Sequence, residues 1–305
     1  MRTLVVGASG AVGSSIVENL EAHGHAVTRA ARRPCPGAVQ VDLRHELEAF
    51  ATLAGEHDVV INASGVEVPT VALHLPGATL VDISATGAYL GALRRTADTV
   101  GASVVLGAGL APGLSTALVG ELDAQDGDEI DVAIMLGSGE KHGAAAVAWT
   151  QSLAGSEVTS RPETEVVTNF RARRTLRGGD GKRRIYLRAD FPDHTLLGGR
   201  YDVRSYLALS SRPVTAALAL VGAAPRLSTL VSAAPAIGDD TWALAAINRR
   251  TGERRGASGR NQSAATADLT VALAERSAAV GPHGSVTAHD LASSEELLAA
   301  LCARP

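Results

Sequence analysis

The sequence of 305 residues predicts an α/β fold in two parts, a doubly wound parallel sheet and a second α+β domain built on a mostly antiparallel sheet. Two observations carry this prediction. Over the first 122 residues, short apolar runs alternate with amphipathic stretches, as in βαβ units whose parallel sheet is buried on both faces. From residue 123 this alternation gives way to strand-like runs of the antiparallel kind, with helical stretches among them.

The first part contains six expected strands. They lie at residues 3–7, 25–31, 38–43, 58–64, 78–84 and 102–109. Amphipathic helical stretches lie between them, at residues 14–23, 45–54 and 87–100. Six strands make a complete doubly wound dinucleotide-binding fold, the Rossmann fold, so we expect such a domain to span residues 1–122.

The turn after the first strand carries a phosphate-binding pattern, in which Gly7, Gly10 and Gly13 form GxxGxxG between a strand and a helix. Glycine permits a tight turn, close approach of the backbone to a pyrophosphate, and close packing of the helix on the strand. The helix N-terminus adds unpaired N–H groups. We expect the pyrophosphate to be surrounded by Gly7, Ser9, Gly10, Ala11, Val12 and Gly13. The alternative is a glycine-rich turn that only packs tightly.

The end of the second strand selects the cofactor. An acidic residue there would bind the ribose 2′-OH of NAD, whereas arginine accommodates the 2′-phosphate of NADP. The chain has Arg32 and Arg33 with no acid beside them, which predicts NADP(H). Asp42 ends the third strand, where the chain passes the adenine; the alternative is an aspartate that only caps a helix.

The fourth and fifth strands end at the edge of the sheet where ligands bind in open α/β folds. Ala63, Ser64 and Gly65 end the fourth strand and let the chain pass the dinucleotide without a clash. Asp82 and Ser84 end the fifth. We expect Asp82 to orient a substrate amine or a ribose, and Ser64, Gly65 and Ser84 to approach the ribose or the nicotinamide.

A second glycine-rich loop, GAGLAPGLST at residues 107–116, follows the sixth strand. Together with GASGAVG, DVVINASG and VDIS, this loop resembles the saccharopine dehydrogenase family and its reductase-like relatives, over residues 1 to about 125. The resemblance implies hydride transfer with a nicotinamide cofactor. It also implies that the loop leads into a substrate-side domain and that Gly109 lies near the ribose or the nicotinamide.

We expect the substrate-side domain to span residues 123–262. Its expected strands lie at residues 129–139, 156–170, 182–191, 202–211 and 241–250, and its helices at 142–155 and 211–224. Helical stretches over 263–280 and 293–303 close the chain. By analogy, we expect residues 263–305 to return to the first domain.

Reduction also needs a proton source. None of the four tyrosines has a lysine four residues later, which argues against the tyrosine–lysine pair of short-chain dehydrogenases. His142, between a strand and a helix, is the candidate proton donor; the alternative is a histidine with only local hydrogen bonds. Trp149 lies two helical turns further along the same face and belongs either to the core or to a pocket wall.

Composition narrows the choice of partners. A net charge of −4 and an aromatic content of 3% argue against a nucleic-acid partner. Cys35 and Cys302 lack zinc-ligand spacing and no HExxH pattern occurs, so we expect no metal. The sequence has neither a signal-peptide core nor 18 consecutive apolar residues, which predicts a cytoplasmic protein without a membrane partner. We expect a homodimer, which is common among cytoplasmic reductases.

The sequence therefore predicts an NADP-dependent oxidoreductase that transfers hydride to a small-molecule C=N bond, or else to a C=O or an activated C=C bond. The alternative is a regulatory protein that binds NADP as a redox sensor without turnover. The absence of a clear acid–base pair keeps this alternative open.

Overall fold

The computed structural model of the protein describes residues 1–139, 144–224, 226 and 238–302. The chain divides into two compact units. The first unit comprises Met1–Ala117 and Ser263–Pro305, and the second comprises Leu118–Gln262. The second unit is therefore an insertion within the chain of the first. In the described part of the chain, the helices are too short or too polar to cross a bilayer.

The first unit is built on a seven-stranded sheet in the order β13-β6-β5-β4-β1-β2-β3, and all its strand pairs are parallel. The strands are β1 (Arg2–Val6), β2 (Ala26–Ala31), β3 (Val39–Gln40), β4 (Val59–Asn62), β5 (Thr79–Asp82), β6 (Val104–Leu106) and β13 (Ser285–Thr287). The strand order reverses between β1 and β4, which places a ligand-binding crevice at the carboxyl ends of these strands.

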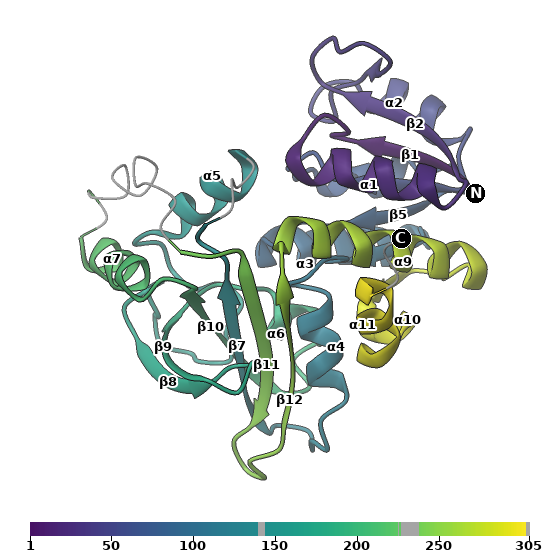
Figure 1. Ribbon diagram of the computed structural model, residues 1–305. Helices are drawn as coiled ribbons and strands as arrows, with labels where there is room; N and C mark the ends of the chain where they lie inside the picture. Colours follow the sequence, from purple (N-terminus) through teal and green to yellow (C-terminus); the bar gives the residue numbers. More distant parts are fainter. Residues whose placement is uncertain (140–143, 225, 227–237, 303–305) are drawn as a thin grey trace. The chain divides into compact units, whose positions relative to one another are not determined.

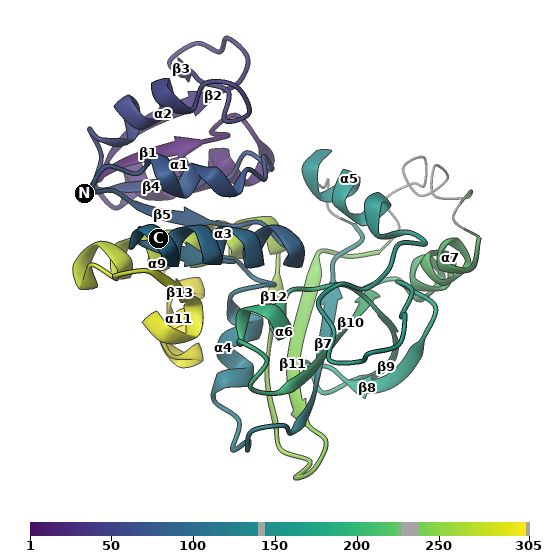
Figure 2. The same cartoon turned by 180° about the vertical axis from the view of Figure 1, so that it is seen from behind.

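Helices cover both faces of this sheet, so its central strands are fully buried (Figures 1 and 2). On one face lie α1 (Ala11–Ala22) and α9 (Gln262–Val280), which are joined by a hydrogen bond from Asn19 to Asp268. The other face carries α2 (Leu47–Ala54), the 3₁₀ helix η1 (Pro69–His74) and α3 (Gly87–Val100). The short helices α10 (Ala288–Leu291) and α11 (Ser294–Cys302) follow β13.

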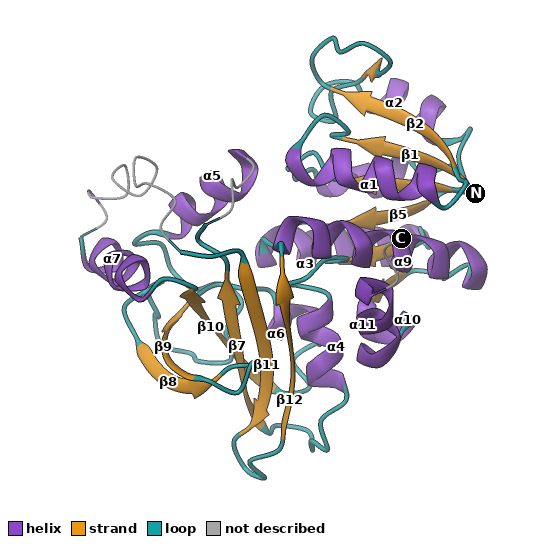
Figure 3. Ribbon diagram, viewed as in Figure 1, coloured by secondary structure: helices purple, strands orange, loops and turns teal. Residues whose placement is uncertain are grey.

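The second unit is built on a six-stranded mixed sheet in the order β12-β11-β7-β10-β9-β8 (Figure 3). Only the central β7–β10 pair is parallel. The strands are β7 (Glu129–Leu136), β8 (Arg173–Arg177), β9 (Arg183–Arg188), β10 (Asp202–Leu209), β11 (Thr241–Asn248) and β12 (Arg254–Arg260). Its helices are α5 (Ala144–Leu153), α6 (Asp193–Leu196) and α7 (Arg212–Ala223), and α4 (Leu114–Gly120) joins the two units.

The sheet of the second unit curls over its own core. The turn between β8 and β9 lies against β11 and β12, where a Cβ on Gly179 would stand 2.0 Å from the carbonyl oxygen of Ala257. Only glycine fits at such a distance, so this position fixes the curl. Inside it, Met135, Tyr186 and Tyr206 belong to one buried apolar cluster.

The α/β fold with a second α+β domain, predicted from the sequence, is confirmed. Three details differ. The expected strand over 156–170 is wrong, because that segment has only an isolated bridge between Glu157 and Thr168. Strand β8 is rich in arginine and strand β12 in arginine and glycine, so both lack the apolar alternation that predicts a strand. The three-residue β13 is too short to stand out in the sequence.

Candidate dinucleotide site

The glycine-rich turn after β1 is shaped by close backbone contacts. Gly7 has a φ of +87°, and a Cβ there would lie 2.6 Å from the carbonyl oxygen of Ala63 at the end of β4. A Cβ on Gly13 would lie 2.1 Å from the carbonyl oxygen of Gly7. Both positions therefore require glycine, and they hold the start of α1 tightly against the ends of β1 and β4.

The N-terminus of α1 is open. Gly10 is its N-cap, no side chain caps it, and its first turn contains no acidic residue. The first N–H groups of a helix have no partner within the helix, and the helix dipole makes this end positive. Ser9, Gly10 and Ala11 are exposed there. A cavity of about 290 Å³, lined in part by Ser9 and Cys35, opens beside this turn. Such an end attracts an anionic group.

Arg32 and Arg33 follow β2 directly, and both side chains are exposed. Neither forms an ion pair with another residue that the structure describes, whereas Arg29, earlier in the same strand, pairs with Glu21 at 2.7 Å. The two guanidinium groups are therefore free to meet an anion. Because they lie at the carboxyl end of β2, they are on the same sheet edge as the glycine turn.

Asp42 is half-buried in the turn that follows β3. Its carboxylate accepts a 3.0 Å hydrogen bond from the backbone N–H of Arg44, and its own N–H donates to Glu46. The N-cap of α2 is Glu46, so Asp42 shapes the turn that precedes the helix and does not cap it.

Asp82 lies at the centre of a buried network at the ends of β4 and β5. Its side chain has no exposed surface, and its Oδ2 accepts 2.8 Å hydrogen bonds from the amide of Asn62 and from the hydroxyl of Tyr89. Its Oδ1 accepts the backbone N–H of Ser84 at 2.8 Å. The side-chain amide oxygen (Oδ1) of Asn62 in turn accepts a 2.6 Å hydrogen bond from the hydroxyl of Ser64. The network thus fixes the loops after both strands.

Burial controls the acid–base properties of this region. Loss of hydration raises the pKa of Asp82 above its usual range, against the hydrogen bonds that the carboxylate accepts. Burial likewise raises the pKa of Tyr89, and the Asp82 charge adds to the shift. Glu67 is an exposed residue, but partial loss of hydration, together with the Asp82 charge, raises its pKa despite a hydrogen bond with Thr86. Glu67 is therefore a carboxyl group that keeps its proton more readily than usual.

The second glycine-rich loop is packed inside the protein. The N–H of Gly109 donates to the carbonyl oxygen of Pro112 at 3.0 Å, and a Cβ on Gly109 would lie 3.2 Å from the methyl group of Thr266 on α9. Gly113 has a φ of +129°, and a Cβ there would lie 2.0 Å from the carbonyl oxygen of Gly109. The loop needs glycine to close on itself before α4 begins.

Most of the predicted site residues come together at one sheet edge. The turn at Gly7–Gly13, Arg32–Arg33, the turn at Asp42, Ala63–Gly65 and the Asp82–Ser84 loop all follow the carboxyl ends of parallel strands. Gly109 follows β6 at the same edge but is buried. His142 lies outside the described residues.

Sequence reasoning missed three residues at this edge, namely Asn62, Glu67 and Tyr89. Asn62 ends a strand in the same zone as Asp82, and that position was the available signal. A search for a lysine four residues after each tyrosine does not reveal Tyr89, because its partner is Asp82.

In the second unit, the Trp149 ring packs edge-on against Phe191 with ring centroids 5.1 Å apart, so it contributes to packing there.

Three potential metal ligands also meet in the first unit. Glu275 of α9 lies 2.9 Å from Nδ1 of His23 and 2.8 Å from Nε2 of His25, and the three ligand atoms lie within 4.8 Å of one another. Motif spacing cannot reveal this group, because Glu275 is 252 and 250 positions from the histidines.

Comparison with known proteins bears on the first unit most directly. Residues 3–113 match the NAD dependent epimerase/dehydratase family, which is just over a third of the chain. No curated protein sequence matches the chain at a significant level.

Two solved structures are similar to the chain over its full length, and another is similar to a smaller part of it. The DAP dehydrogenase of C. glutamicum, solved in complex with DAP, is 15% identical with a TM-score of 0.50, over 100% of this chain and 98% of that one. An engineered D-amino acid dehydrogenase bound to NADP+ is 14% identical with a TM-score of 0.47, over 100% and 99% of the two chains. An exported protein of Burkholderia pseudomallei is 26% identical over only 28% of this chain and 49% of that one, with a TM-score of 0.24.

The DAP dehydrogenase therefore shares the two-unit fold of this chain. The resemblance to saccharopine dehydrogenases stays a prediction. Together, the parallel sheet, the open glycine turn and the family match over residues 3–113 show that the first unit has the Rossmann fold that is typical of nicotinamide dinucleotide-binding domains.

Proposed function

We propose that the protein is an NADP-dependent oxidoreductase that transfers hydride to the C=N bond of a small molecule. The observation that carries this proposal is the uncapped glycine turn at the start of α1, on the same sheet edge as the two exposed arginines after β2. The bound nicotinamide would supply the hydride. The protein would supply binding, orientation and a proton.

The cofactor fits the residues present. The open N–H groups of Ala11, Val12 and Gly13 suit the pyrophosphate, and the lack of a side chain at Gly10 leaves room for it. Arg32 and Arg33 suit the 2′-phosphate, because a guanidinium forms charge-assisted hydrogen bonds with phosphate oxygens.

An imine acceptor is supported by fold and by chemistry. The DAP dehydrogenase of the same fold was solved with DAP bound, which makes an amine-bearing substrate the first class to test. An iminium carbon is also a better hydride acceptor than a ketone, so the protein needs less to activate it. Carbonyl and activated alkene compounds are the other acceptors to include.

We assign Asp82 a positioning role, since its carboxylate is fully buried and occupied by three internal hydrogen bonds. It holds Asn62 and Ser64, and through them the backbone that packs on Gly7. Glu67, whose raised pKa favours the protonated form, is the candidate proton donor at this edge. His142 remains the other candidate donor.

The test is titration of the purified protein with NADPH and NADH, followed by loss of reduced-nicotinamide absorbance with imines, ketones and enoyl compounds. The Arg32→Gln, Arg33→Gln double variant should weaken NADPH binding by about a hundredfold and leave NADH binding nearly unchanged, because only NADPH carries the 2′-phosphate. Arg95→Gln, an exposed arginine on α3, is the matched control. Equal losses for both cofactors, or none, would refute the assignment.

A second candidate function is an NADP-binding redox sensor without turnover. The inaccessible carboxylate of Asp82 favours it, because that group cannot touch a substrate in the state described. Tight NADPH binding with no oxidation across the whole panel would support the sensor, whereas oxidation by one substrate class would exclude it.

A further inference from the structure

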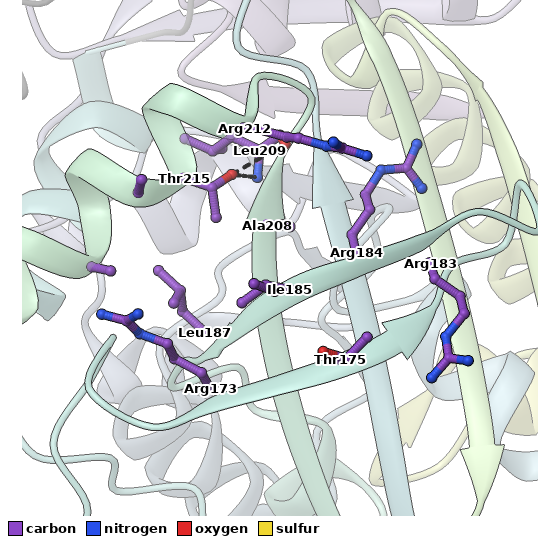
Figure 4. Close-up of a pocket in the computed structure, with 12 residues that line it drawn as sticks. Arg173, Thr175, Arg183, Arg184, Ile185, Leu187, Ala208, Leu209, Arg212 and Thr215 are labelled. Atoms are coloured by element: carbon purple, nitrogen blue, oxygen red, sulfur yellow. Dashed lines mark hydrogen bonds between the residues drawn. The ribbon is translucent and has the colours of Figure 1, made fainter.

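The second unit contains a groove of its own. It has a volume of about 320 Å³ and lies between α7 and the two-stranded ribbon of β8 and β9 (Figure 4). Its apolar lining includes Ile185 and Leu187 of β9 and Ala216 and Ala219 of α7. The size is at the lower end of what small-molecule sites require.

The polar lining of the groove is cationic. Arg173, Arg183, Arg184 and Arg212 line it, and none of the described residues that line it is acidic. Arg184 is neutralised by Asp180 at 2.6 Å. The other three are exposed and form no ion pair with any residue in the described ranges. In a chain with a net charge of −4, this local excess of positive charge is uncompensated.

The strand register concentrates charge at one end of the groove. Arg183 of β9 lies directly opposite Arg177 of β8, so two like charges share one face of the ribbon. Two residues further along, Thr175 lies opposite Ile185. Directly opposed arginines repel each other, and an anion between them would relieve that repulsion.

Arg212 adds a positive charge to the same end of the groove. It begins α7 soon after Leu209 ends β10, and the antiparallel register of β10 with β9 brings that end of β10 beside the beginning of β9. Figure 4 shows the Arg212 side chain extending across the top of the groove toward the end where β9 begins. Arg173 is at the opposite end of the groove.

Between the charged ends, the floor is apolar and open. Ile185 is 55% exposed although it is at the middle of a strand. Exposed apolar surface of this kind, rimmed by polar groups, is typical of binding grooves. The groove therefore offers an apolar surface next to exposed guanidinium groups, which complements a molecule that has an apolar body and an anionic head.

We propose that this groove binds a small amphipathic carboxylate, with its carboxylate at the end of the groove where Arg183 and Arg212 lie and its apolar body on Ile185 and Leu187. A guanidinium matches a carboxylate because it donates two parallel hydrogen bonds. The described residues that line the groove include no aromatic side chain on which a nucleic-acid base would stack, so the apolar floor favours the small carboxylate.

The test is calorimetric titration of the full-length protein with octanoate, and with octanol and acetate as compounds that lack the charge or the apolar body. We expect octanoate to bind at least tenfold more tightly than either, with an affinity that falls as sodium chloride is added. The Arg183→Gln, Arg212→Gln double variant should weaken octanoate binding by about tenfold or more. Arg95→Gln is the matched control in the first unit.

The apolar half of the proposal is tested with Ile185→Thr, which keeps a β-branched residue on the strand and should also weaken octanoate binding. Its control is Val166→Thr, an exposed valine that does not line the groove. All these positions are exposed, and a thermal unfolding scan verifies that each variant is folded.

Four results would overturn the proposal. They are unchanged octanoate affinity in the folded groove variants, octanol binding equal to that of octanoate, binding only to anionic vesicles or an oligonucleotide, and a dimer whose interface occludes the groove. None of these depends on NADPH binding, so this proposal and the proposed oxidoreductase activity fail separately.

Discussion

The amide of Asn62 donates a 2.8 Å hydrogen bond to the carboxylate of Asp82, and these two residues are register partners at the ends of neighbouring parallel strands. The bond therefore connects the last residue pair of β4 and β5 through their side chains. From Asn62 the hydrogen bonds continue to Ser64, whose backbone lies against Gly7 of the glycine turn. A fully buried carboxylate thus supports the cofactor turn without being exposed to a ligand.

Replacing Asp82 by alanine should destabilise the protein by roughly 3 kcal/mol, because buried donors on Asn62 and Tyr89 lose their acceptor at about 1–3 kcal/mol each. Chemical denaturation measures this loss. NADPH affinity should fall with it in the fraction that stays folded. Asp82→Asn should be milder, because it keeps one acceptor oxygen. Equal effects of the two substitutions would contradict the assigned role.

The raised pKa of Asp82 also sets a pH dependence. A folded state that holds the proton more tightly than the unfolded state loses stability as the pH rises above the unfolded value of about 3.9. The wild type should therefore lose stability relative to Asp82→Asn as the pH rises from about 4 toward neutrality. Paired thermal scans of the two proteins measure the difference, and a constant difference would contradict the shift.

Two glycines of the turn after β1 have different roles, because Gly13 is needed for packing and Gly10 for contact with the cofactor. Gly13→Ala should destabilise the protein by about 3 kcal/mol or more, since the added Cβ would overlap the backbone oxygen of Gly7. Gly10→Ala adds a Cβ 3.2 Å from the same oxygen at an exposed site, so it should fold nearly normally. We expect Gly10→Ala to weaken NADPH binding all the same, because its methyl group occupies the approach to the pyrophosphate. Normal NADPH affinity in this variant would place the cofactor elsewhere.

Glu67 should act as a proton donor in the proposed reduction. Its raised pKa keeps the acid form to higher pH, so the wild-type rate should fall as the pH rises through that pKa. Glu67→Gln should lower kcat by about a hundredfold and remove this limb of the pH profile, while NADPH affinity stays unchanged. An unaltered pH profile would transfer the role to another group, with His142→Gln the next variant to measure.

Glu275 links α9 to the segment after α1 through its hydrogen bonds with His23 and His25. Burial acts to raise the pKa of Glu275, but the hydrogen bonds and charges of His25 and His23 lower it overall. A lowered carboxylate pKa stabilises the fold above the unfolded value of about 4.3, and this contribution is lost as the pH falls through the folded value.

The Glu275→Gln variant should thus be less stable at neutral pH by about 0.5–1 kcal/mol, since the group is partly exposed and screened by solvent. The difference from the wild type should vanish on acidification below about pH 4. Glu56→Gln, at an exposed glutamate on the turn after α2, is the control for thermal scans over this range. A difference that persists at low pH would show that the pair contributes through packing.

The parts of the fold that the sequence predicts are those with strong local patterns. The apolar run of β4 and the glycine turn at Gly7 can be recognised in the sequence, because burial and backbone geometry restrict the residues allowed there. Strand β12, with the sequence RRGASGR, has no such pattern, because its place at the edge of the sheet is set by pairing with β11 and not by its own side chains.

The candidate site is predicted less completely, for a physical reason. Asp82 is recognisable from its position at a strand end, but its partners depend on how neighbouring strands align. Tyr89 reaches Asp82 only because α3 starts beneath the end of β5, and Glu67 senses that carboxylate only through space. Distances in space of this kind cannot be read from the spacing of residues along the sequence.

The seventh strand of the first unit comes from the far end of the chain. Strand β13 pairs with β6 across the whole of the inserted second unit. During synthesis, β6 therefore emerges long before its partner and presents an unpaired strand edge, which is a template for association with other chains. The first unit cannot complete its sheet until residues 285–287 have left the ribosome, so the nascent segment that contains β6 needs protection from aggregation until then.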